Sequence, residues 1–335
     1  MNFDGFRLPA EWEPQVRTWM TWPQNLDTWY SGSIVKAEEE YTSFVKHIAK
    51  SQIACIQCSS NETIERVTKL FVDLTNIEFY LHPTNDAWCR DYGPDFLINK
   101  ENKYKITLDW QFNSWGDKYP PYDEDNKTPE RISDVLELNS VVLDMILEGG
   151  SIEVNGLGDL ITTKSCLLNQ NRNKDLDQSQ IEEMLKGLFQ VNNVVWLEDG
   201  IEGDDTDGHI DDFCRFVPNG NILLAKDEFS EKNNIILTTN KKLLQQSFPK
   251  SEIIDVPLPK TEIIFEGEKL PASYLNYCLT NKHVLVPIFG DENDTIALDI
   301  IQQNFPGRET VGLRANHLVI GLGSFHCLTK HEPSL

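Results

Sequence analysis

VRTWMTWP, residues 16–23, is followed by SIVKAEEEYTSFVKHIAK, residues 33–50, and then by IACIQC, residues 53–58. The first and third stretches are short and apolar, which is typical of strands. The second stretch has apolar residues at helical spacing, and Ser31 or Ser33 is a candidate N-cap, so we predict a helix over 33–50. The order strand, helix, strand predicts an α/β fold.

The same helix-to-strand order recurs along the rest of the chain. The pairs are NETIERVTKLFVDL before IEFYLH, SQIEEMLKGLF before VVWLED, EKNNIILTTNKKLLQQS before EIIDVP, and DTIALDIIQQNF before ETVGL. No exact sequence repeat accompanies them, so periodicity alone predicts an α/β protein in which a small unit is repeated. The polar, Pro-rich stretch 113–130 is predicted to form a mobile flap rather than a domain boundary.

Charge and cysteine content narrow the class of protein. The chain has 335 residues, of which 30 are basic and 53 acidic, and its net charge of -23 disfavours nucleic acid and favours a cationic small molecule as partner. We find neither a signal peptide in MNFDGFRLPAEWEP nor an apolar run that could span a membrane, so we expect a cytoplasmic protein with no membrane partner. Cys55 and Cys58 form a CxxC, but within a predicted strand, where burial is more common than metal binding.

Four loop-like stretches contain Gly together with reactive side chains. They are TNDAWCRDYGP (84–94), LEGGS (147–151), GDDTDGHIDD (203–212) and GSFHC (323–327). A calcium loop starting at Asp205 would need Gly at its sixth position, which is Ile210. His209 and Asp211 could ligate a metal, but no further ligand motif accompanies them. We therefore predict no metal.

A site built around a cysteine nucleophile accounts for more of these residues than a metal site does. Cys327 needs a nearby His to manage protons, and His209 is a candidate whose ring Glu148 could hold and polarise. Asp91 and Asp211 add two carboxylates, which suit a planar guanidinium with its forked N–H donors. Acids around Cys327 should make its free thiol resist ionisation until a cation binds.

The alternatives are structural. Asp91 could pair only with Arg90, Glu148 could cap a turn, and His326 could be a buried histidine with its hydrogen bonds satisfied. Cys327 itself could be a metal ligand or a small buried side chain.

The four stretches resemble those of the agmatine deiminases and of the wider bacterial group that includes peptidyl-arginine deiminases of the Porphyromonas type. The likeness extends over nearly the whole chain, through GFRLPAEWEPQVRTWMTWP, LDWQFNSWG, LEGGSIEVNGLGDLITTKSCLLNQNRN, ASYLNY and VPIFGDENDTIALDIIQQNFPGR. It implies the pentein fold, a five-bladed α/β-propeller of repeated ββαβ units, as a single domain over residues 1–335.

The resemblance also implies roles for individual residues. Cys327 matches the nucleophile, His209 the general acid/base, Asp91 and Asp211 the guanidinium-binding carboxylates, and Glu148 the Glu that supports the site. The implied reaction is hydrolysis of agmatine to N-carbamoylputrescine and ammonia, in putrescine and polyamine biosynthesis. It proceeds through an amidino-thioether on Cys327, without metal or organic cofactor. A protein-arginine deiminase, and a non-catalytic or metal-binding protein of the same fold, are the alternatives.

Substrate contacts and oligomeric state are less defined. Trp88 is predicted to wall the pocket, and Asp205 or Asp204 to bind the amine end of agmatine. No clustered Arg pair stands near the motifs to hold a carboxylate, which favours agmatine over arginine or an arginine peptide. A homo-oligomer is one of the assembly states that the sequence leaves open.

One motif departs from the family pattern. Agmatine deiminases often have G-G-G-N-I-H-C where residues 321–327 read GLGSFHC, so Leu322 and Phe325 are expected to narrow the pocket floor. Asp125, in the polar stretch 113–130, is expected to be exposed.

Overall fold

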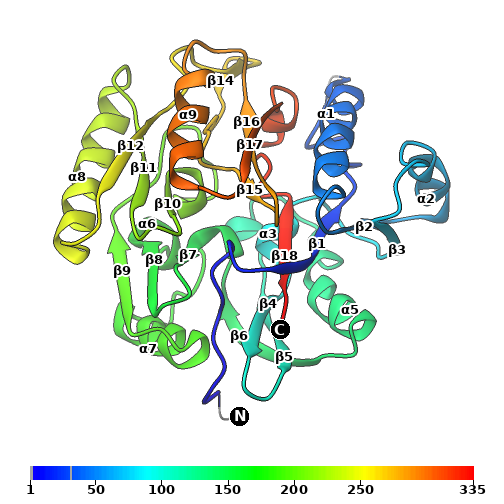
Figure 1. The fold of residues 1–335 in the computed structure, drawn as a ribbon, viewed down its shortest axis with the longest axis horizontal. Coiled ribbons are helices and arrows are strands. Elements are labelled where there is room, and N and C mark those ends of the chain that lie inside the picture. Colours follow the sequence, from blue (N-terminus) through cyan, green and yellow to red (C-terminus); the bar gives the residue numbers. More distant parts are fainter. Residues whose placement is uncertain (1–2, 31) are drawn as a thin grey trace.

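A computed structural model of the chain describes residues 3–30 and 32–335. The strands of this part form six sheets, and five of the sheets contain an antiparallel pair joined to a further, parallel strand. A helix precedes that parallel strand, because parallel neighbours need a crossover connection. In Figure 1 these crossover helices lie toward the outside of the molecule.

Four of these units follow one another along the chain. They comprise β4 (Asp95–Asn99), β5 (Tyr104–Gln111), α5 (Thr128–Val135) and β6 (Asn139–Ile146); β7 (Ile152–Val154), β8 (Asp159–Thr163), α7 (Gln178–Phe189) and β9 (Asn193–Leu197); β10 (Cys214–Phe216), β11 (Ile222–Lys226), α8 (Glu231–Ser247) and β12 (Ile253–Pro257); and β15 (Cys278–Leu279), β16 (His283–Ile288), α9 (Asp294–Asn304) and β17 (Glu309–Arg314). The predicted α/β alternation is therefore confirmed.

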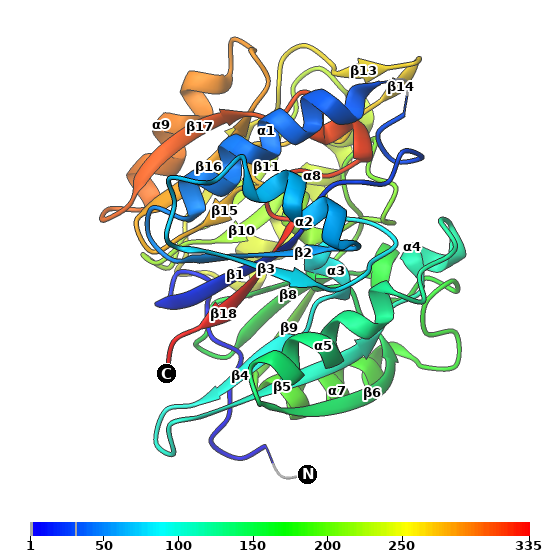
Figure 2. The same cartoon turned by 90° about the vertical axis from the view of Figure 1, so that its right-hand side faces the viewer.

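The remaining unit joins both ends of the described chain. Its elements are β18 (Thr329–Pro333), β1 (Gln15–Thr21), α1 (Ser33–Ile48), β2 (Ile53–Cys58), α2 (Asn61–Thr68) and β3 (Ile77–Leu81). Strand β18 is antiparallel to β1, with Gln15 opposite Pro333, and β2 and β3 add parallel strands. Figures 1 and 2 show the red β18 beside the blue β1. This pairing places the loop before β18, which carries Cys327, next to the first sheet.

Two predictions about the first sheet can be checked here. Cys55 and Cys58 lie buried in β2, as the CxxC analysis expected. Helix α1 begins at Ser33 and its N-cap is Gly32, whose φ of 79° is left-handed, so the prediction of Ser33 as the N-cap is wrong. The other candidate, Ser31, lies outside the described residues.

The other elements are short. They are α3 (Cys89–Tyr92), α4 (Ser114–Asp117), α6 (Lys164–Leu167), the 3₁₀ turns η1 (Asp125–Lys127), η2 (Gly149–Ser151), η3 (Ile210–Asp212) and η4 (Leu318–Gly321), and the hairpin β13 (Ile264–Phe265) with β14 (Glu268–Lys269). Two of them, α4 and η1, lie in the stretch 113–130 that was predicted to form a flap, and the first turn of α5 follows them there. In α4 the residues Ser114, Trp115, Gly116 and Asp117 all have positive φ, so it is a left-handed turn, which is costly for L-residues.

The core explains why the crossover helices sit where they do. Helix α1 buries Ala37, Tyr41, Phe44 and Ile48, which repeat at helical spacing on one face. The Phe44 ring stacks on Phe325, with centroids 4.3 Å apart and planes 10° from parallel. Phe325 thus anchors the Cys327 loop to α1.

The helices described here can also be judged as membrane spans. None of them, over residues 3–30 and 32–335, combines the length and the hydropathy that crossing a bilayer requires.

We predict that Phe325→Ala lowers the free energy of unfolding by about 3–5 kcal/mol, because it leaves a cavity beneath α1 where the ring is fully buried. Urea denaturation followed by tryptophan fluorescence measures the change. Phe229→Ala is the control, since Phe229 is 64% exposed and should change stability by less than about 0.5 kcal/mol. Equal stabilities for the two variants would contradict the anchoring role.

Candidate active site

A cleft of about 780 Å³ opens above the loops that carry the reactive stretches. Its walls include Trp88, Asp91, Trp115, Asp205 and Cys327. These residues come from short helices and loops that connect different sheets, so the cleft exists only once the repeated units are assembled.

Cys327 lies at the cleft wall with 8% of its surface exposed. Its Sγ is 2.9 Å from Asn276 Nδ2, which donates to it, and 3.7 Å from Asp211 Oδ2. Burial raises the pKa of the Cys327 thiol well above its ordinary value, and the carboxylates of Asp211, Asp212 and Asp91 raise it further. The expectation that the free thiol resists ionisation is confirmed.

Asp91 joins three segments at the site. It lies in α3, its Oδ1 accepts a hydrogen bond from Gly150 N at 2.9 Å, and its Oδ2 accepts one from Trp115 Nε1 at 3.0 Å. Burial raises the pKa of this carboxyl. Arg90 pairs instead with Glu11, at 2.7 Å, so the alternative in which Asp91 serves only Arg90 is wrong.

The surroundings of Gly150 explain one of the two glycines of LEGGS. A Cβ at this position would lie 2.6 Å from His209 Nδ1 and 2.8 Å from Asp91 Oδ1, closer than real side chains approach. Only glycine lets the two side chains meet across this backbone.

The His209 ring is 1% exposed and lies near several acids. Its Nδ1 is 3.8 Å from Asp91 Oδ1, and within residues 3–30 and 32–335 its Nε2 has no hydrogen-bond partner. Burial disfavours the charged ring, but the carboxylates of Asp91, Glu148 and Asp211 outweigh burial and raise the pKa of His209. Nε2 is thus part of a ring whose protonated form the neighbouring carboxylates favour.

Glu148 was predicted to hold the His209 ring, but its carboxylate forms its hydrogen bond with Arg172 instead, so the predicted contact is wrong. Glu148 Oε1 accepts from Arg172 Nε at 2.5 Å, and both side chains are fully buried. Arg172 also pairs with Asp207 at 2.8 Å, so it links LEGGS to the loop that carries His209. Glu148 acts on His209 through its charge rather than through a hydrogen bond.

Asp211 has one oxygen engaged and one free. Its Oδ2 lies 2.6 Å from His326 Nδ1, whereas Oδ1 is buried without a hydrogen-bond partner among the described residues. Burial opposes ionisation, but the hydrogen bond and charge of His326 outweigh it and lower the pKa of Asp211. Cys327, His209, Asp91 and Asp211 therefore meet at one place.

The residues proposed for the far end of a substrate are already engaged. Asp205 lines the cleft, but Lys118 Nζ lies 3.4 Å from its carboxylate and the Tyr119 hydroxyl donates to it. Asp204 orders the His209 loop, because its Oδ2 accepts from the backbone of Gly208 at 3.0 Å and of His209 at 2.9 Å.

The sequence suggested no clustered arginine pair for a carboxylate, and the cleft contains lysines instead. Lys118 and Lys269 both line it. Each is engaged with acids, Lys118 with Asp205 and Asp207, and Lys269 with Glu202 and Glu262.

Predictions for the cleft wall are met in part. Trp88 lines the cleft and packs against Gly321 and Gly323, where a Cβ would lie 2.7 Å from its ring. Leu322 also lines the cleft. Phe325, which was expected to narrow the floor, is fully buried against α1. The expected exposure of Asp125 is also wrong, because it is 2% exposed and accepts from Asn85 N at 2.7 Å.

Sequence reasoning missed Asn276, Arg172 and Trp115 as parts of the site. Each lies inside a stretch quoted for the family resemblance, ASYLNY, NQNRN and FNSWG. Asn276 Oδ1 accepts from His326 N at 3.0 Å while its Nδ2 meets the thiol, so it fixes the Cys327 loop from both sides.

Two groups of ligand-type side chains lie close together in the described part of the chain. They are Glu148, Cys166 and His209, and Asp211, Asp212 and Cys327, each with atoms within 4.8 Å. Glu148 already binds Arg172, and Asp212 accepts from Asn276. Proximity alone assigns no ion to either group, and the expected absence of a metal stays a prediction.

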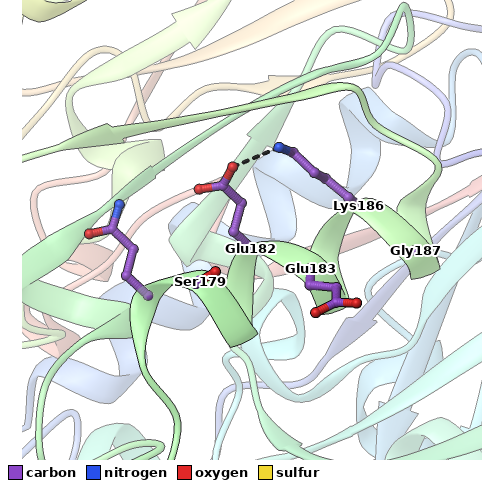
Figure 3. Close-up of a pocket in the computed structure, with 6 residues that line it drawn as sticks. Ser179, Glu182, Glu183, Lys186 and Gly187 are labelled. Atoms are coloured by element: carbon purple, nitrogen blue, oxygen red, sulfur yellow. Dashed lines mark hydrogen bonds and ion pairs between the residues drawn. The ribbon is translucent and has the colours of Figure 1, made fainter.

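Another hollow lies over α7 and is drawn in Figure 3. It is lined by Gln178, Ser179, Glu182, Glu183, Lys186 and Gly187. Glu182 and Lys186 pair with each other at 2.7 Å, and none of the six residues lines the Cys327 cleft. The reactive side chains therefore point to the larger cleft.

Comparison with known proteins gives a consistent result. The curated agmatine deiminase of Pseudomonas fluorescens is 34% identical, over 99% of this chain and 96% of that protein. Among solved structures, the agmatine deiminase of Enterococcus faecalis superposes with a TM-score of 0.91 at 32% identity, over 99% of this chain and 96% of that one. The substrate-bound agmatine deiminase of C. jejuni superposes with a TM-score of 0.90 at 29% identity, over 98% and 96% of the two chains.

The sequence model of one family covers almost the whole molecule. It describes the Porphyromonas-type peptidyl-arginine deiminases and matches residues 7–333, which include all the loops that meet at the cleft. The chain therefore belongs to the Porphyromonas-type peptidyl-arginine deiminase family.

Proposed function

We propose that this protein is an agmatine deiminase, which hydrolyses the guanidinium of agmatine to N-carbamoylputrescine and ammonia and serves putrescine biosynthesis. The observation that carries the proposal is the placement of the Cys327 thiol 3.7 Å from Asp211, with Asp91 and His209 beside it. One buried oxygen of Asp211 has no hydrogen-bond partner in the described part of the chain. The agmatine deiminases of P. fluorescens and E. faecalis, similar over full length, support the choice of substrate.

Asp91 and Asp211 bind the guanidinium in this proposal. A planar cation with forked N–H donors matches two carboxylates, and a buried cation without such partners would be prohibitively unstable. Trp88 offers an aromatic wall, over which a guanidinium is attracted. The bound positive charge also offsets the acids that raise the pKa of Cys327, so substrate binding favours the thiolate.

The first half of the reaction removes ammonia. The Cys327 thiol loses its proton to solvent as the cation enters, and the thiolate forms a C–S bond to the guanidinium carbon. His209, whose raised pKa keeps it protonated, donates its proton to one nitrogen of the tetrahedral adduct. That C–N bond breaks, ammonia leaves, and a cationic amidino-thioether remains on Cys327.

The second half releases the product. Neutral His209 takes a proton from water, and the resulting hydroxide bonds to the same carbon. The C–S bond then breaks with its electron pair returning to sulfur, and the product loses a proton to give the neutral ureido group. His209 is again protonated, Cys327 is again a thiolate, and the proposed steps need no metal or organic cofactor.

Asp205 remains our candidate for the amine end of agmatine. Its carboxylate already meets Lys118 and Tyr119 at the cleft, so the substrate amine would compete with Lys118 for it. Asp204 is less suited, because both of its oxygens accept from the loop that carries His209.

We also infer a five-bladed propeller formed by a single domain over residues 1–335. The five sheets that share the ββαβ order support this arrangement. A cytoplasmic location is supported by seven free cysteines, which suit a reducing compartment.

An ammonia-release screen over agmatine, arginine and an arginine peptide tests the activity. We expect agmatine to be turned over with the highest kcat/KM, because no free cation in the cleft awaits a carboxylate among the described residues. Preference for the peptide would replace the proposal with a protein-arginine deiminase, and release from none would leave a non-catalytic protein of the same fold.

We predict that Cys327→Ser abolishes ammonia release, because a serine hydroxyl at this position cannot form the amidino-thioether. Turnover is measured with agmatine, and thermal unfolding checks that the fold is kept. Cys58→Ala, at a buried cysteine of β2 outside the cleft, should keep the turnover per folded molecule. Near-normal turnover by the serine variant would exclude covalent catalysis by Cys327.

We predict that Asp91→Asn and Asp211→Asn each lower kcat/KM by about two to four orders of magnitude, since each leaves a buried cation short of one partner, worth roughly 3–5 kcal/mol. Asp123→Asn is the matched control, because its side chain is 70% exposed. Surface pairs contribute little, so this control should change kcat/KM less than about threefold.

Measuring the three variants at low and moderate salt separates a binding pocket from diffuse attraction by the net charge of -23. Similar, modest and salt-sensitive losses in all three would count against a two-carboxylate pocket.

We predict that exhaustive chelation leaves kcat/KM unchanged, because the proposed steps use only protein groups and water. Activity before and after chelation, with metal analysis of the protein, measures this. Loss of activity that a single added metal restores would assign ligand roles to the groups around His209 and Asp211.

A further inference from the structure

A line of hydrogen bonds leads from the buried Asp211 through the buried His326 to Glu11, whose side chain is 17% exposed. His326 Nδ1 lies 2.6 Å from Asp211 Oδ2, and His326 Nε2 lies 2.8 Å from Glu11 Oε1. The imidazole is 1% exposed and Asp211 is fully buried. Asp211, His326 and Glu11 all lie behind the residues that line the cleft, and Asp211 is the one whose carboxylate reaches the cleft-wall thiol of Cys327, at 3.7 Å.

We propose that Glu11 and His326 are positioning residues for the proposed substrate site. Glu11 holds His326 as an imidazolium, and His326 in turn holds Asp211 as an oriented, ionised carboxylate that binds the guanidinium. The inference deepens the proposed function and rests on it, since it assigns a purpose to the charge on Asp211. It adds no chemical step to the reaction.

Hydrogen-bonding capacity supports the imidazolium. A neutral imidazole has one donor and one acceptor nitrogen, yet both ring nitrogens of His326 face carboxylate oxygens. Two ionised carboxylates accept only, so both nitrogens must donate. The ring then carries a positive charge between Glu11 and Asp211.

Cations keep Glu11 ionised. Arg90 Nη1 lies 2.7 Å and Arg215 Nη2 2.9 Å from its carboxylate. His331 Nδ1 lies 3.5 Å away, but burial lowers the pKa of His331 to about 4, so this ring is neutral near pH 7. Burial opposes the charge on Glu11, but the two arginines and His326 outweigh it and hold the pKa of Glu11 well below its ordinary value. Of the other titratable groups near Glu11, Glu153, Tyr277 and Cys278 add no positive charge.

On the cleft side, Asp211 faces groups of both signs. His326, His209 and Arg215 favour its ionised form, whereas Asp91, Asp212 and Cys327 oppose it. His326 is the cation in hydrogen-bond contact, at Oδ2, and it leaves Oδ1 buried and free of protein partners among the described residues. The arrangement therefore fixes both which oxygen is available and its charge.

The direction of the expected pH effect follows from this geometry. His326 lowers the pKa of Asp211, so Asp211 stays ionised in acid and the guanidinium can bind. Loss of the imidazolium raises that pKa, and the acid limb of kcat/KM moves to higher pH. An opposite charge in contact shifts a carboxyl by about 1–3 pH units, which sets the expected size.

Three variants and a control isolate the line. His326→Asn keeps a neutral donor near Asp211 and removes the charge, Glu11→Gln removes the group that holds the charge, and the third combines them. Glu153→Gln is the control, because Glu153 also binds the buried Arg215, at 3.1 Å, but has no hydrogen bond or ion pair with His326 within residues 3–30 and 32–335.

Two readouts are measured on each protein. One is the pH profile of kcat/KM for agmatine, and the other is the titration of the Asp211 carboxyl by ¹³C NMR of aspartate-labelled protein, assigned through Asp211→Asn. We expect both midpoints to rise in His326→Asn and Glu11→Gln, to rise no further in the double variant than in His326→Asn, and to stay in place in Glu153→Gln.

The outcomes separate the two proposals. A wild-type protein that leaves agmatine intact would reject the proposed function, and the NMR titration would still decide the inference. An Asp211 midpoint unmoved by His326→Asn, or shifts that add in the double variant, would overturn it. If Glu11→Gln fails to fold, the His326→Asn titration alone carries the decision.

Discussion

The repulsion among acids gathered around one buried thiol is the constraint on which the site depends. Asp91, Glu148, Asp211 and Asp212 are all buried, and each disfavours ionisation of the others or of Cys327. Such a group is stable only if cations and donors from elsewhere compensate it. The acids around Cys327 therefore favour the binding of a cation.

The compensating groups come from distant parts of the chain, and this explains the architecture around the cleft. Arg172 neutralises Glu148, His326 neutralises Asp211, and Trp115 and Gly150 donate to Asp91. The repeated units bring their loops to one place, so donors and cations from one loop can contact acids on another. The left-handed turn at residues 114–117 is locally strained. It places the Trp115 indole where its N–H donates a hydrogen bond to Asp91.

Much of this could be predicted from the sequence, for identifiable reasons. Helical spacing in α1 and α8 and the apolar runs of β2 and β9 are local signals, and the structure follows them. The meeting of Cys327, His209, Asp91 and Asp211 could be anticipated because loop residues without a packing purpose cluster at sites. The contacts that individual side chains make could not be predicted from the sequence. Glu148 binds Arg172, Asp125 is buried under Asn85, and Phe325 turns toward α1, and each outcome depends on which surface the fold lays against that residue.

The pairing of β1 with β18 has a kinetic consequence. Gln15 and Pro333 are opposite one another, although nearly the whole chain separates them. Closing a loop of that length has an entropic penalty that must be met before the contact contributes any stability, so such contacts form late in folding. Cys327 sits on the loop that enters β18, and Asn276 and Arg90 donate hydrogen bonds to it there. A partly folded molecule can thus contain several folded units while Cys327 is still out of position. A complete cleft therefore indicates that folding is complete.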